Sequence, residues 1–390
     1  MSASNSSLKM KLRAKMKRRV VLVVLAALII VIGVPAINYG LYSWAHNQAF
    51  ENFVKPQINN QVISLNSRLL PKYKYNYLLK KIEKSHREFL LIYGNSTQFH
   101  LRDQIFQEQV ECELKTFYNM SHHSIDYLDA KHFFSSISEY VGKDWTILLG
   151  VYPDMFTKIA RSSTPSIDHP WNNLSLWIDN ISDGNTSISS LFPRLLNIEW
   201  PITPAGWFPF IRQYQNTFDL ALSGKPDEYL YHDGSVKFIG ADQRRIDRNE
   251  KNIRLDGNNL KMIAARNINS PFDEELLTAF QDTINLLTER GAEVIAYEAQ
   301  LTDYLGGARW HKPERTIRYL EMMQDLQENN HKFSYLTREK TWINLSEELW
   351  LDGSHISFEG GDKIIKNLSA LIPLDSQCRS RLNGSKINDF

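Results

Sequence analysis

Short, unbroken apolar runs separated by helical patterns are the feature of this 390-residue chain that most constrains its fold. Runs of this kind are typical of strands that are buried on both faces of a parallel sheet, because helices then cover both sides. The chain has such runs at 89–93, 114–121, 144–153, 260–268, 293–299 and 333–337. We therefore predict an α/β fold, a three-layer α/β/α domain built on a mostly parallel sheet.

The helical patterns between these runs carry their own start and stop signals. A mixed stretch covers 124–142, and a polar helix is expected from about Pro313 to Asn329. Another helix opens at Asp273 and ends at Gly291, because aspartate favours the N-cap and glycine the position after the last turn. The apolar faces of this helix and of the last helix are Leu276, Leu277, Phe280, Ile284 and Leu287, and Ile364, Ile365, Leu368, Leu371 and Ile372.

The N-terminus joins a basic segment to a long apolar run. Residues 9–19 carry seven basic side chains and no acidic one, and residues 20–37 carry no charge. Continued through residue 42, the run covers the roughly 30 Å hydrocarbon layer at about 1.5 Å per residue. We predict a transmembrane helix at 20–42, with the basic tail 1–19 in the cytoplasm and the chain after about residue 45 outside the cell membrane. A cleaved signal peptide is the alternative, although the run is longer than a usual signal core.

The rest of the chain divides by composition. We predict a stalk or first helix at 43–87, the α/β domain at 88–375 and a tail at 376–390. Segment 157–257, rich in Pro, Trp, Asn, Ser and Gly, indicates an insertion or a lid beside the sheet. Within it, 229–240 predicts a β-hairpin whose Asp233-Gly234 pair favours a type I′ turn, so His232 and Asp233 are interpreted as turn residues.

Charge and cysteine content exclude some functions. The net charge of +1 provides no global basic field, which argues against a nucleic-acid partner. The two cysteines, Cys112 and Cys378, lack metal-ligand spacing, and outside the cytoplasm they could form a disulfide.

Asp352 and His355 lie three residues apart, directly before the last helix. In a tight turn, residues at this spacing can face each other. The aspartate can then accept the Nδ1–H of the histidine, which fixes the tautomer and leaves Nε2 as a general base. A base of this kind needs a nucleophile from elsewhere in the chain.

Ser96 is the best candidate for that nucleophile. It stands where the apolar run 89–93 ends and a helix is expected to begin, and the carboxyl ends of parallel strands are where ligands bind. Gly94 allows the backbone to turn sharply. The Ser96 backbone N–H, at a helix start, would point toward a developing oxyanion. His122 and His123 could suggest a metal, but adjacent histidines in a polar loop are more often solvated.

These segments resemble the first and last sequence blocks of the SGNH, or GDSL-like, hydrolase superfamily. The first block is Gly94-Asn95-Ser96, with Asn95 in place of the family's acidic residue. The last is Asp352-Gly353-Ser354-His355, continued by Ile356-Ser357-Phe358-Glu359-Gly360. The likeness covers about 88–155 and 260–372. The single anchor and outward-facing domain are similar to a membrane-anchored branch that includes DltD, AlgJ and AlgX, proteins of teichoic acid and alginate acylation.

The resemblance implies acyl transfer or ester hydrolysis through an acyl-serine. Ser96 would attack the carbonyl, His355 would move the proton and Asp352 would orient His355. The oxyanion would be bound by the Ser96 N–H with groups near Asn119 and Gly150. The family's G-x-N-D block is replaced here by Gly150-Val151-Tyr152-Pro153-Asp154, which lacks the asparagine donor.

The resemblance also implies partners. The expected substrate is an ester-bearing cell-surface glycan or polymer, a multi-spanning membrane O-acyltransferase is a candidate partner, and no metal or diffusible cofactor is required. One alternative is a non-catalytic partner of such an acyltransferase. Another is a membrane-tethered glycan-binding module, in which Trp200, Trp207, Phe208 and Phe210 stack on sugar rings instead of packing in a core.

Overall fold

The fold was analysed in a computed structural model of the full chain. The structure describes residues 20–22, 34–58, 60–84, 88–103, 115–123, 126–157, 215–216, 218–241, 243, 270–302, 313–352 and 354–372. The predicted strand at 260–268, both cysteines and the aromatic cluster at 200–210 lie outside these residues.

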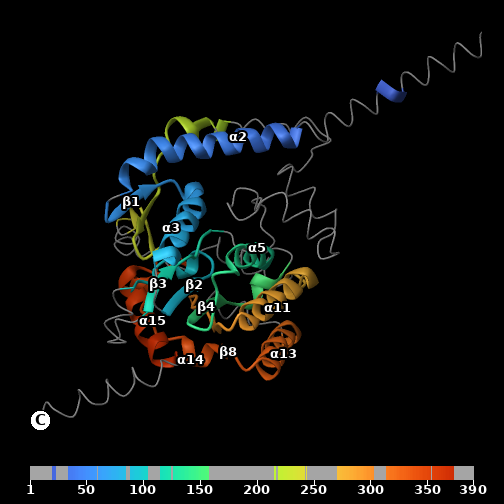
Figure 1. The fold of residues 1–390 in the computed structure, drawn as a ribbon. Coiled ribbons are helices and arrows are strands. Elements are labelled where there is room, and N and C mark those ends of the chain that lie inside the picture. Colours follow the sequence, from blue (N-terminus) through green and yellow to red (C-terminus); the bar gives the residue numbers. More distant parts are fainter. Residues whose placement is uncertain are drawn as a thin grey trace, which may run out of the picture.

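A five-stranded parallel sheet forms the centre of the part of the chain that the structure describes (Figure 1). Its strand order is β3-β2-β4-β7-β8. The strands are β2 (Glu88–Tyr93), β3 (Lys115–Asn119), β4 (Trp145–Val151), β7 (Glu293–Glu298) and β8 (Phe333–Leu336). Each falls on a predicted apolar run, so the prediction of an α/β fold with a parallel sheet is confirmed.

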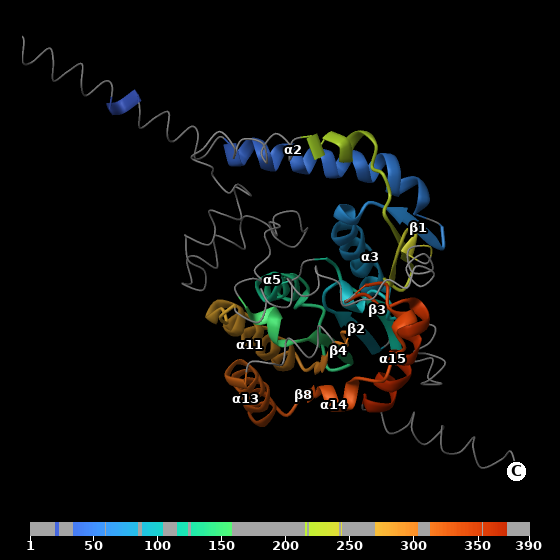
Figure 2. The same cartoon turned by 180° about the vertical axis from the view of Figure 1, so that it is seen from behind.

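Helices pack on both faces of this sheet. One face carries α5 (Tyr127–Ile137), α11 (Glu274–Glu289) and α13 (Pro313–Asn329), and the opposite face carries α15 (Phe358–Leu371). The view from behind shows the same separation (Figure 2). Alternate residues of β2 enter the two cores: Leu91 joins the first, and Leu90 and Ile92 join the second.

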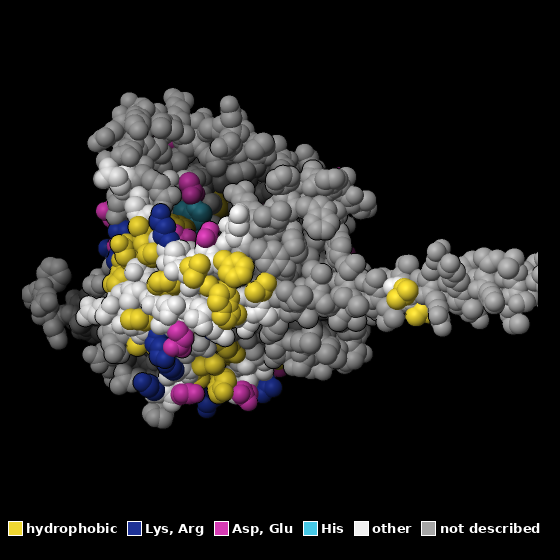
Figure 3. Space-filling view, turned by 90° about the horizontal axis from the view of Figure 1, so that it is seen from above, with side chains coloured by type: hydrophobic (Ala, Val, Ile, Leu, Met, Phe, Trp, Pro, Cys, Tyr) yellow, Lys and Arg dark blue, Asp and Glu magenta, His cyan; other side chains and the backbone are white. Residues whose placement is uncertain are grey.

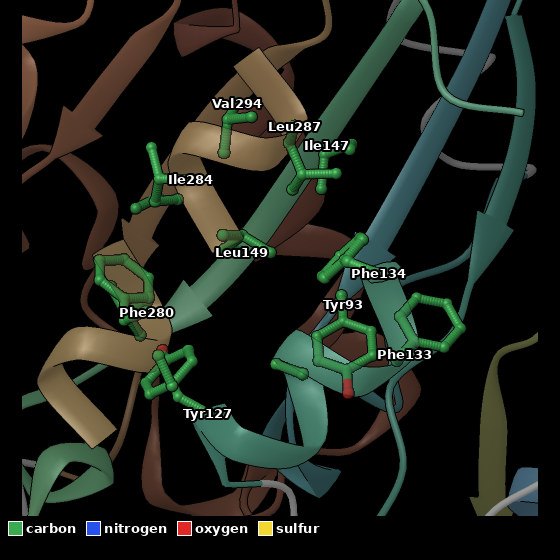
Figure 4. Packing of buried hydrophobic residues seen from close by; sticks show 14 of the residues in the cluster. Tyr93, Tyr127, Phe133, Phe134, Ile147, Leu149, Phe280, Ile284, Leu287 and Val294 are labelled. Carbon is green, nitrogen blue, oxygen red and sulfur yellow. The ribbon is translucent and has the colours of Figure 1, made fainter. Parts of the chain in front are cut away.

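The larger core lies between the sheet and α5 and α11 (Figure 4). Ile147 and Leu149 of β4 face Ile284 and Leu287 of α11, while Tyr93 stacks on Phe133 of α5 with ring centroids 4.8 Å apart. All five predicted apolar residues of α11 are buried. Burial of each such side chain stabilises the fold by about 1.5–3 kcal/mol, which holds the sheet and its strand ends in place.

The ends of α11 follow the predicted signals. Asp273 is the N-cap, and its side chain accepts a hydrogen bond from the Glu275 N–H at 3.1 Å. Gly291 follows the C-cap with φ +99°, a left-handed conformation that glycine adopts without steric cost.

A second, three-stranded antiparallel sheet combines the predicted stalk with the predicted insertion. Its strands are β1 (Val62–Leu65), β5 (Glu228–Tyr231) and β6 (Val236–Phe238) in the order β1-β5-β6. The segment 43–87 therefore contributes a strand, as well as the helix α3 (Leu70–Lys84), to the folded body. A third apolar cluster lies beneath this sheet, and it includes Phe99 from the loop after β2.

The hairpin β5–β6 is confirmed, but its turn differs from the predicted type I′. Gly234 N–H donates to Tyr231 O, so the central residues of the turn are His232 and Asp233, and Gly234 follows with φ +82°. This is the three-residue loop with a left-handed glycine. The side chain of Asp233 favours it, because Oδ1 accepts hydrogen bonds from the Ser235 N–H and hydroxyl.

The N-terminal helix α2 (Val34–Ala49) crosses the top of the molecule. Trp44 and Phe218 meet edge to face at 5.8 Å, and both are partly exposed, as is Leu222. Figure 3 shows hydrophobic side chains gathered on this upper face. Among the described residues, no helix has both the length and the apolarity to cross a bilayer. Most of the predicted segment 20–42 lies outside them.

Candidate active site

Ser96 lies at the carboxyl end of β2, in the middle of the sheet. The chain leaves β2 for β3 on one side and returns to β4 on the other, so the strand order reverses at this point. In open parallel sheets, ligands bind at such a switch point, outside the carboxyl ends of the strands. Ser96 opens a single 3₁₀ turn, η5 (Ser96–Gln98), and not the longer helix that the sequence suggested.

Asn95 shapes this turn as its N-cap. Its Oδ1 accepts hydrogen bonds from the Thr97 N–H at 3.1 Å and from the Thr97 hydroxyl at 2.6 Å. Its amide nitrogen donates to the hydroxyl of Tyr152, which follows β4. The asparagine thus fills the capping role that a carboxylate would fill, and it fixes the backbone on which Ser96 sits.

Asp352 and His355 form a compact turn before α15. Asp352 Oδ1 accepts the backbone N–H groups of Ser354 and His355 at 2.8 and 2.9 Å. Ser357 then caps α15 by accepting a hydrogen bond from the Gly360 N–H. The local sequence alone therefore places the carboxylate and the imidazole beside each other.

The fold brings the Ser96 turn and the Asp352–His355 turn together. His355 Nε2 lies 2.8 Å from Ser96 Oγ, and His355 Nδ1 lies 2.6 Å from Asp352 Oδ2. A carboxylate can only accept, so Nδ1 carries the proton and Nε2 accepts the hydrogen bond of the serine hydroxyl. The three predicted catalytic side chains are thus brought together in the order nucleophile, base and orienting acid.

The electrostatics of the turn keep this orientation. Burial raises the pKa of Asp352, but the hydrogen bond and charge of His355, with the N–H groups of the turn, outweigh it and lower the pKa to about 2. The carboxylate is therefore ionised at neutral pH and stabilises an imidazolium. The site is open, because 22% of the His355 side chain and 55% of the Asp352 side chain are exposed.

His100, which the sequence analysis did not select, borders this site. Burial, His355 and Arg102 lower the pKa of His100 to about 3, so this imidazole is neutral and does not add a cation beside His355. A Cβ on Gly361 would lie 2.4 Å from the His100 ring. The glycine therefore lets the first turn of α15 approach His100 closely.

Gly150 has a packing role beside the buried side chain of Gln98. It lies within β4, paired with Tyr297 of β7, and a Cβ there would lie 2.5 Å from Cδ of Gln98. Gly94 faces the other side of the same side chain, since its Cβ would lie 2.1 Å from Gln98 Oε1. The two glycines together make room for buried Gln98, which belongs to the Ser96 turn.

The side chain of Asn119 makes hydrogen bonds within the protein. Its amide nitrogen donates to Gln98 O at 2.8 Å and Leu101 O at 3.0 Å, and its Oδ1 accepts the Ser121 N–H. Because both amide hydrogens are used, Asn119 holds the loop after Ser96 and does not face a substrate oxygen. The Ser96 backbone N–H has no hydrogen-bond acceptor within the described ranges, whereas the Asn119 N–H donates to Asp233 O.

Of the paired histidines, His122 is not solvated as the sequence suggested. It is fully buried, with Nε2 3.5 Å from Asp129 Oδ2. The His123 side chain is partly exposed, and its Nε2 atom bonds to the buried Glu228 carboxylate. The acidic partners come from α5 and β5, and no local sequence pattern indicated these contacts.

No group of three or more histidine, cysteine, aspartate or glutamate side chains in the described ranges is arranged to hold a metal ion. Comparison with models of known protein families found none that matches the chain. A comparison with curated proteins likewise found no matching relative.

Proposed function

We propose that this chain is an SGNH-type serine esterase or O-acyltransferase that works through an acyl-serine. The observation that carries the proposal is the relay from Ser96 Oγ through His355 to Asp352, with distances of 2.8 and 2.6 Å. Its position at the switch point of a parallel sheet with helices on both faces supports a three-layer, SGNH-like domain.

The relay supports a two-step reaction. Ser96 Oγ attacks the ester carbonyl while His355 Nε2 takes the hydroxyl proton, and the Ser96 N–H stabilises the oxyanion. The tetrahedral intermediate expels the alcohol, which takes the proton from His355, and acyl-Ser96 remains. Water or an acceptor hydroxyl then attacks the acyl group and gives its proton to His355, which returns it to Ser96 Oγ.

The oxyanion side of the site favours a slow or specialised enzyme. Both amide hydrogens of Asn119 have other acceptors, and a missing donor typically costs about 100–1,000-fold in rate. The same observation favours a second candidate, a non-catalytic partner that keeps the fold and binds a membrane O-acyltransferase.

We place the domain outside the cell membrane, on a single anchor at 20–42 with a cytoplasmic N-terminus. The basic segment 9–19 before the apolar run supports this orientation. Trp44, which is partly exposed, lies directly after the anchor and contacts the ring of Phe218, and this suits an interfacial position. An ester-bearing cell-surface glycan or polymer is the substrate class that fits this location.

A fluorophosphonate probe tests the proposal, because it reacts with activated serine hydroxyls. We expect the full chain to be labelled, and labelling to be lost in Ser96→Ala and reduced at least tenfold in His355→Ala. Ser346→Ala, which removes an exposed hydroxyl that contacts Glu348 and not the triad, is the control and should be labelled normally. A folded protein that is not labelled would favour the non-catalytic partner.

A further inference from the structure

A second histidine–carboxylate pair lies close to the triad. His123 follows β3, and its Nε2 atom bonds to Glu228 of β5, 105 residues further along the chain. The Glu228 side chain is 1% exposed, whereas 36% of the His123 side chain is exposed. A buried carboxylate therefore holds one ring nitrogen of a histidine that solutes can reach.

Phe238 connects this pair with the triad. It lies opposite Glu228 in the β5–β6 register, so both side chains are on the same side of the hairpin. Its ring is 5.1 Å from the ring of His355 and 5.9 Å from the ring of His123, measured between centroids. Phe99, from the Ser96 turn, lies beneath His123 at 4.9 Å.

Two hydrogen bonds hold the β5–β6 hairpin in this position. Val236 N–H donates to Phe99 O, and Asp103 N–H donates to the side chain of Asp233, so the hairpin is fixed to the loop after Ser96 at two points. The described contacts give His123 no part in the Ser96–His355–Asp352 relay. A histidine presented in this way beside an open reaction centre is suited to bind a substrate group.

The chemistry of the pair indicates the group that it binds. When Nε2–H donates its hydrogen bond to the Glu228 carboxylate, Nδ1 of the neutral ring keeps a lone pair and can accept a hydrogen bond from a hydroxyl. A half-buried phenyl ring beside such an acceptor offers an apolar surface for the C–H face of a sugar or polyol. An aromatic face with few polar groups is the usual composition of a small-ligand site.

We propose that His123, Glu228 and Phe238 form an acceptor subsite that binds a polyhydroxylated acceptor, such as a pyranose ring, next to acyl-Ser96. This proposal rests on the proposed function and names its acceptor class. His123 is a specificity residue here: it binds a neighbouring hydroxyl of the acceptor, while His355 deprotonates the attacking one.

Transfer and hydrolysis can be measured together with p-nitrophenyl acetate as acyl donor and methyl α-D-glucopyranoside as acceptor. Release of p-nitrophenol gives total turnover, and mass spectrometry of the acetylated glycoside gives transfer. We expect His123→Ala and Phe238→Leu each to lower transfer about tenfold, the value of one good hydrogen bond or contact, with hydrolysis changed less than twofold. Tetrahydropyran-2-methanol, which has one hydroxyl, should be a poor acceptor for the native protein and should be unaffected by His123→Ala, because it has no neighbouring hydroxyl for His123 to bind.

His232→Gln is the matched control, because His232 is an exposed histidine of the same hairpin that contacts Tyr77 instead of the triad. It should leave both transfer and hydrolysis unchanged. Equal losses of transfer and hydrolysis in His123→Ala and Phe238→Leu would overturn the subsite and leave these residues as supports for His355.

Binding separates this proposal from the proposed function. In Ser96→Ala no acyl-enzyme can form, but saturation-transfer NMR should still detect bound methyl α-D-glucopyranoside, and the signal should disappear in the Ser96→Ala/His123→Ala double variant. Binding without turnover in the native protein would retain the subsite and reject the esterase. Turnover without glycoside binding would reject the subsite alone.

Discussion

At the scale of single residues, the carboxylate of Asp352 is the most exposed part of the relay. It is held by His355 and by two N–H groups of its own turn, and these contacts lower its pKa to about 2 although burial acts in the opposite direction. In the proposed mechanism it fixes the tautomer of His355 and stabilises the imidazolium. Because solvent screens its charge, this carboxylate stabilises the imidazolium less than a buried triad carboxylate would.

Replacing this carboxylate gives a direct prediction. We expect Asp352→Asn to lower ester turnover by about 10³-fold, somewhat less than the ~10⁴-fold loss reported for a buried triad. Steady-state kinetics with p-nitrophenyl acetate measure this loss. Asp362→Asn is the control for the change of charge, because it neutralises a carboxylate of α15 that pairs with Arg102. A loss below tenfold would mean that Asp352 does not orient the base.

Asp352 also makes stability depend on acid. Its pKa in the folded chain is below its ordinary value of 3.8, so the folded state favours the ionised form. The stabilisation is fully present above about pH 4 and is lost as the pH falls toward 2.

Lys74 predicts a change of stability on the alkaline side of neutral pH. Its side chain is fully buried and donates to Ser121 O, and burial lowers its pKa to about 7, although Glu228 and Asp233 act to raise it. Between about pH 7 and pH 10 the unfolded chain keeps a proton that the folded chain loses. The free energy of unfolding should therefore rise with pH in this window, by at most about 1.4 kcal/mol per unit.

Urea unfolding from pH 6 to pH 10 tests this rise. Lys74→Met should remove it, whereas Lys80→Met, an exposed lysine of the same helix, should leave it in place. A rise that is identical in the native protein and in Lys74→Met would show that another group is responsible.

At the scale of elements, the turn that carries Ser96 is positioned by what packs behind it. Gln98 fills the space above Gly94 and Gly150, so two strands and the nucleophile turn share one buried side chain. The sequence predicted backbone freedom for Gly94 and an oxyanion role for Gly150. Their packing role could not be predicted, because the contact joins residues from the segment after β2, from β4 and from the Ser96 turn.

A matched set of variants tests this packing. Gly150→Ala should destabilise the fold by about 1–3 kcal/mol and lower fluorophosphonate labelling, since its Cβ would meet Gln98 at 2.5 Å. Gly142→Ala, with no atom within 4 Å of the new Cβ, should have little effect. Gln98→Ala should restore part of the stability that Gly150→Ala loses, and independent effects of the two changes would contradict the account.

The boundaries of most elements were predictable, because they depend on local physics. The strands β2, β4 and β7 followed from unbroken apolar runs, and α11 followed from Asp273, its apolar face and Gly291. The hairpin turn was less predictable. A type I′ turn centred on Asp233-Gly234 and the observed three-residue loop are both local solutions, and the contacts of Asp233 with Ser235 and Asp103 favour the second.

At the scale of the whole molecule, the small sheet β1-β5-β6 links the N-terminal segment to the candidate active site. β1 lies between the proposed anchor and the α/β domain in sequence, while β6 carries Phe238 to the ring of His355. The proposed anchor and the triad are therefore connected through one antiparallel sheet. A membrane at the level of α2 would leave β2 and α15, the elements next to the two triad turns, on the folded body beneath it (Figure 1).

Topology in the membrane is open to experiment. We expect the full chain with tags at both ends to stay in the membrane fraction after alkaline carbonate washing. Protease added to intact cells should remove the C-terminal tag and spare the N-terminal tag. Loss of the N-terminal tag together with release of the domain would indicate a cleaved signal peptide instead.

The sequence by itself determined the elements and one half of the site. Apolar runs, caps and the three-residue spacing of Asp352 and His355 act over a few residues, so their outcome does not depend on distant parts of the chain. The tertiary structure decided the rest. It brought Ser96 within 2.8 Å of His355 across 259 residues, turned Asn119 toward the loop carbonyls, and paired His123 with Glu228. These contacts follow from how the helices and the small sheet pack on the main sheet, and no local pattern records that packing.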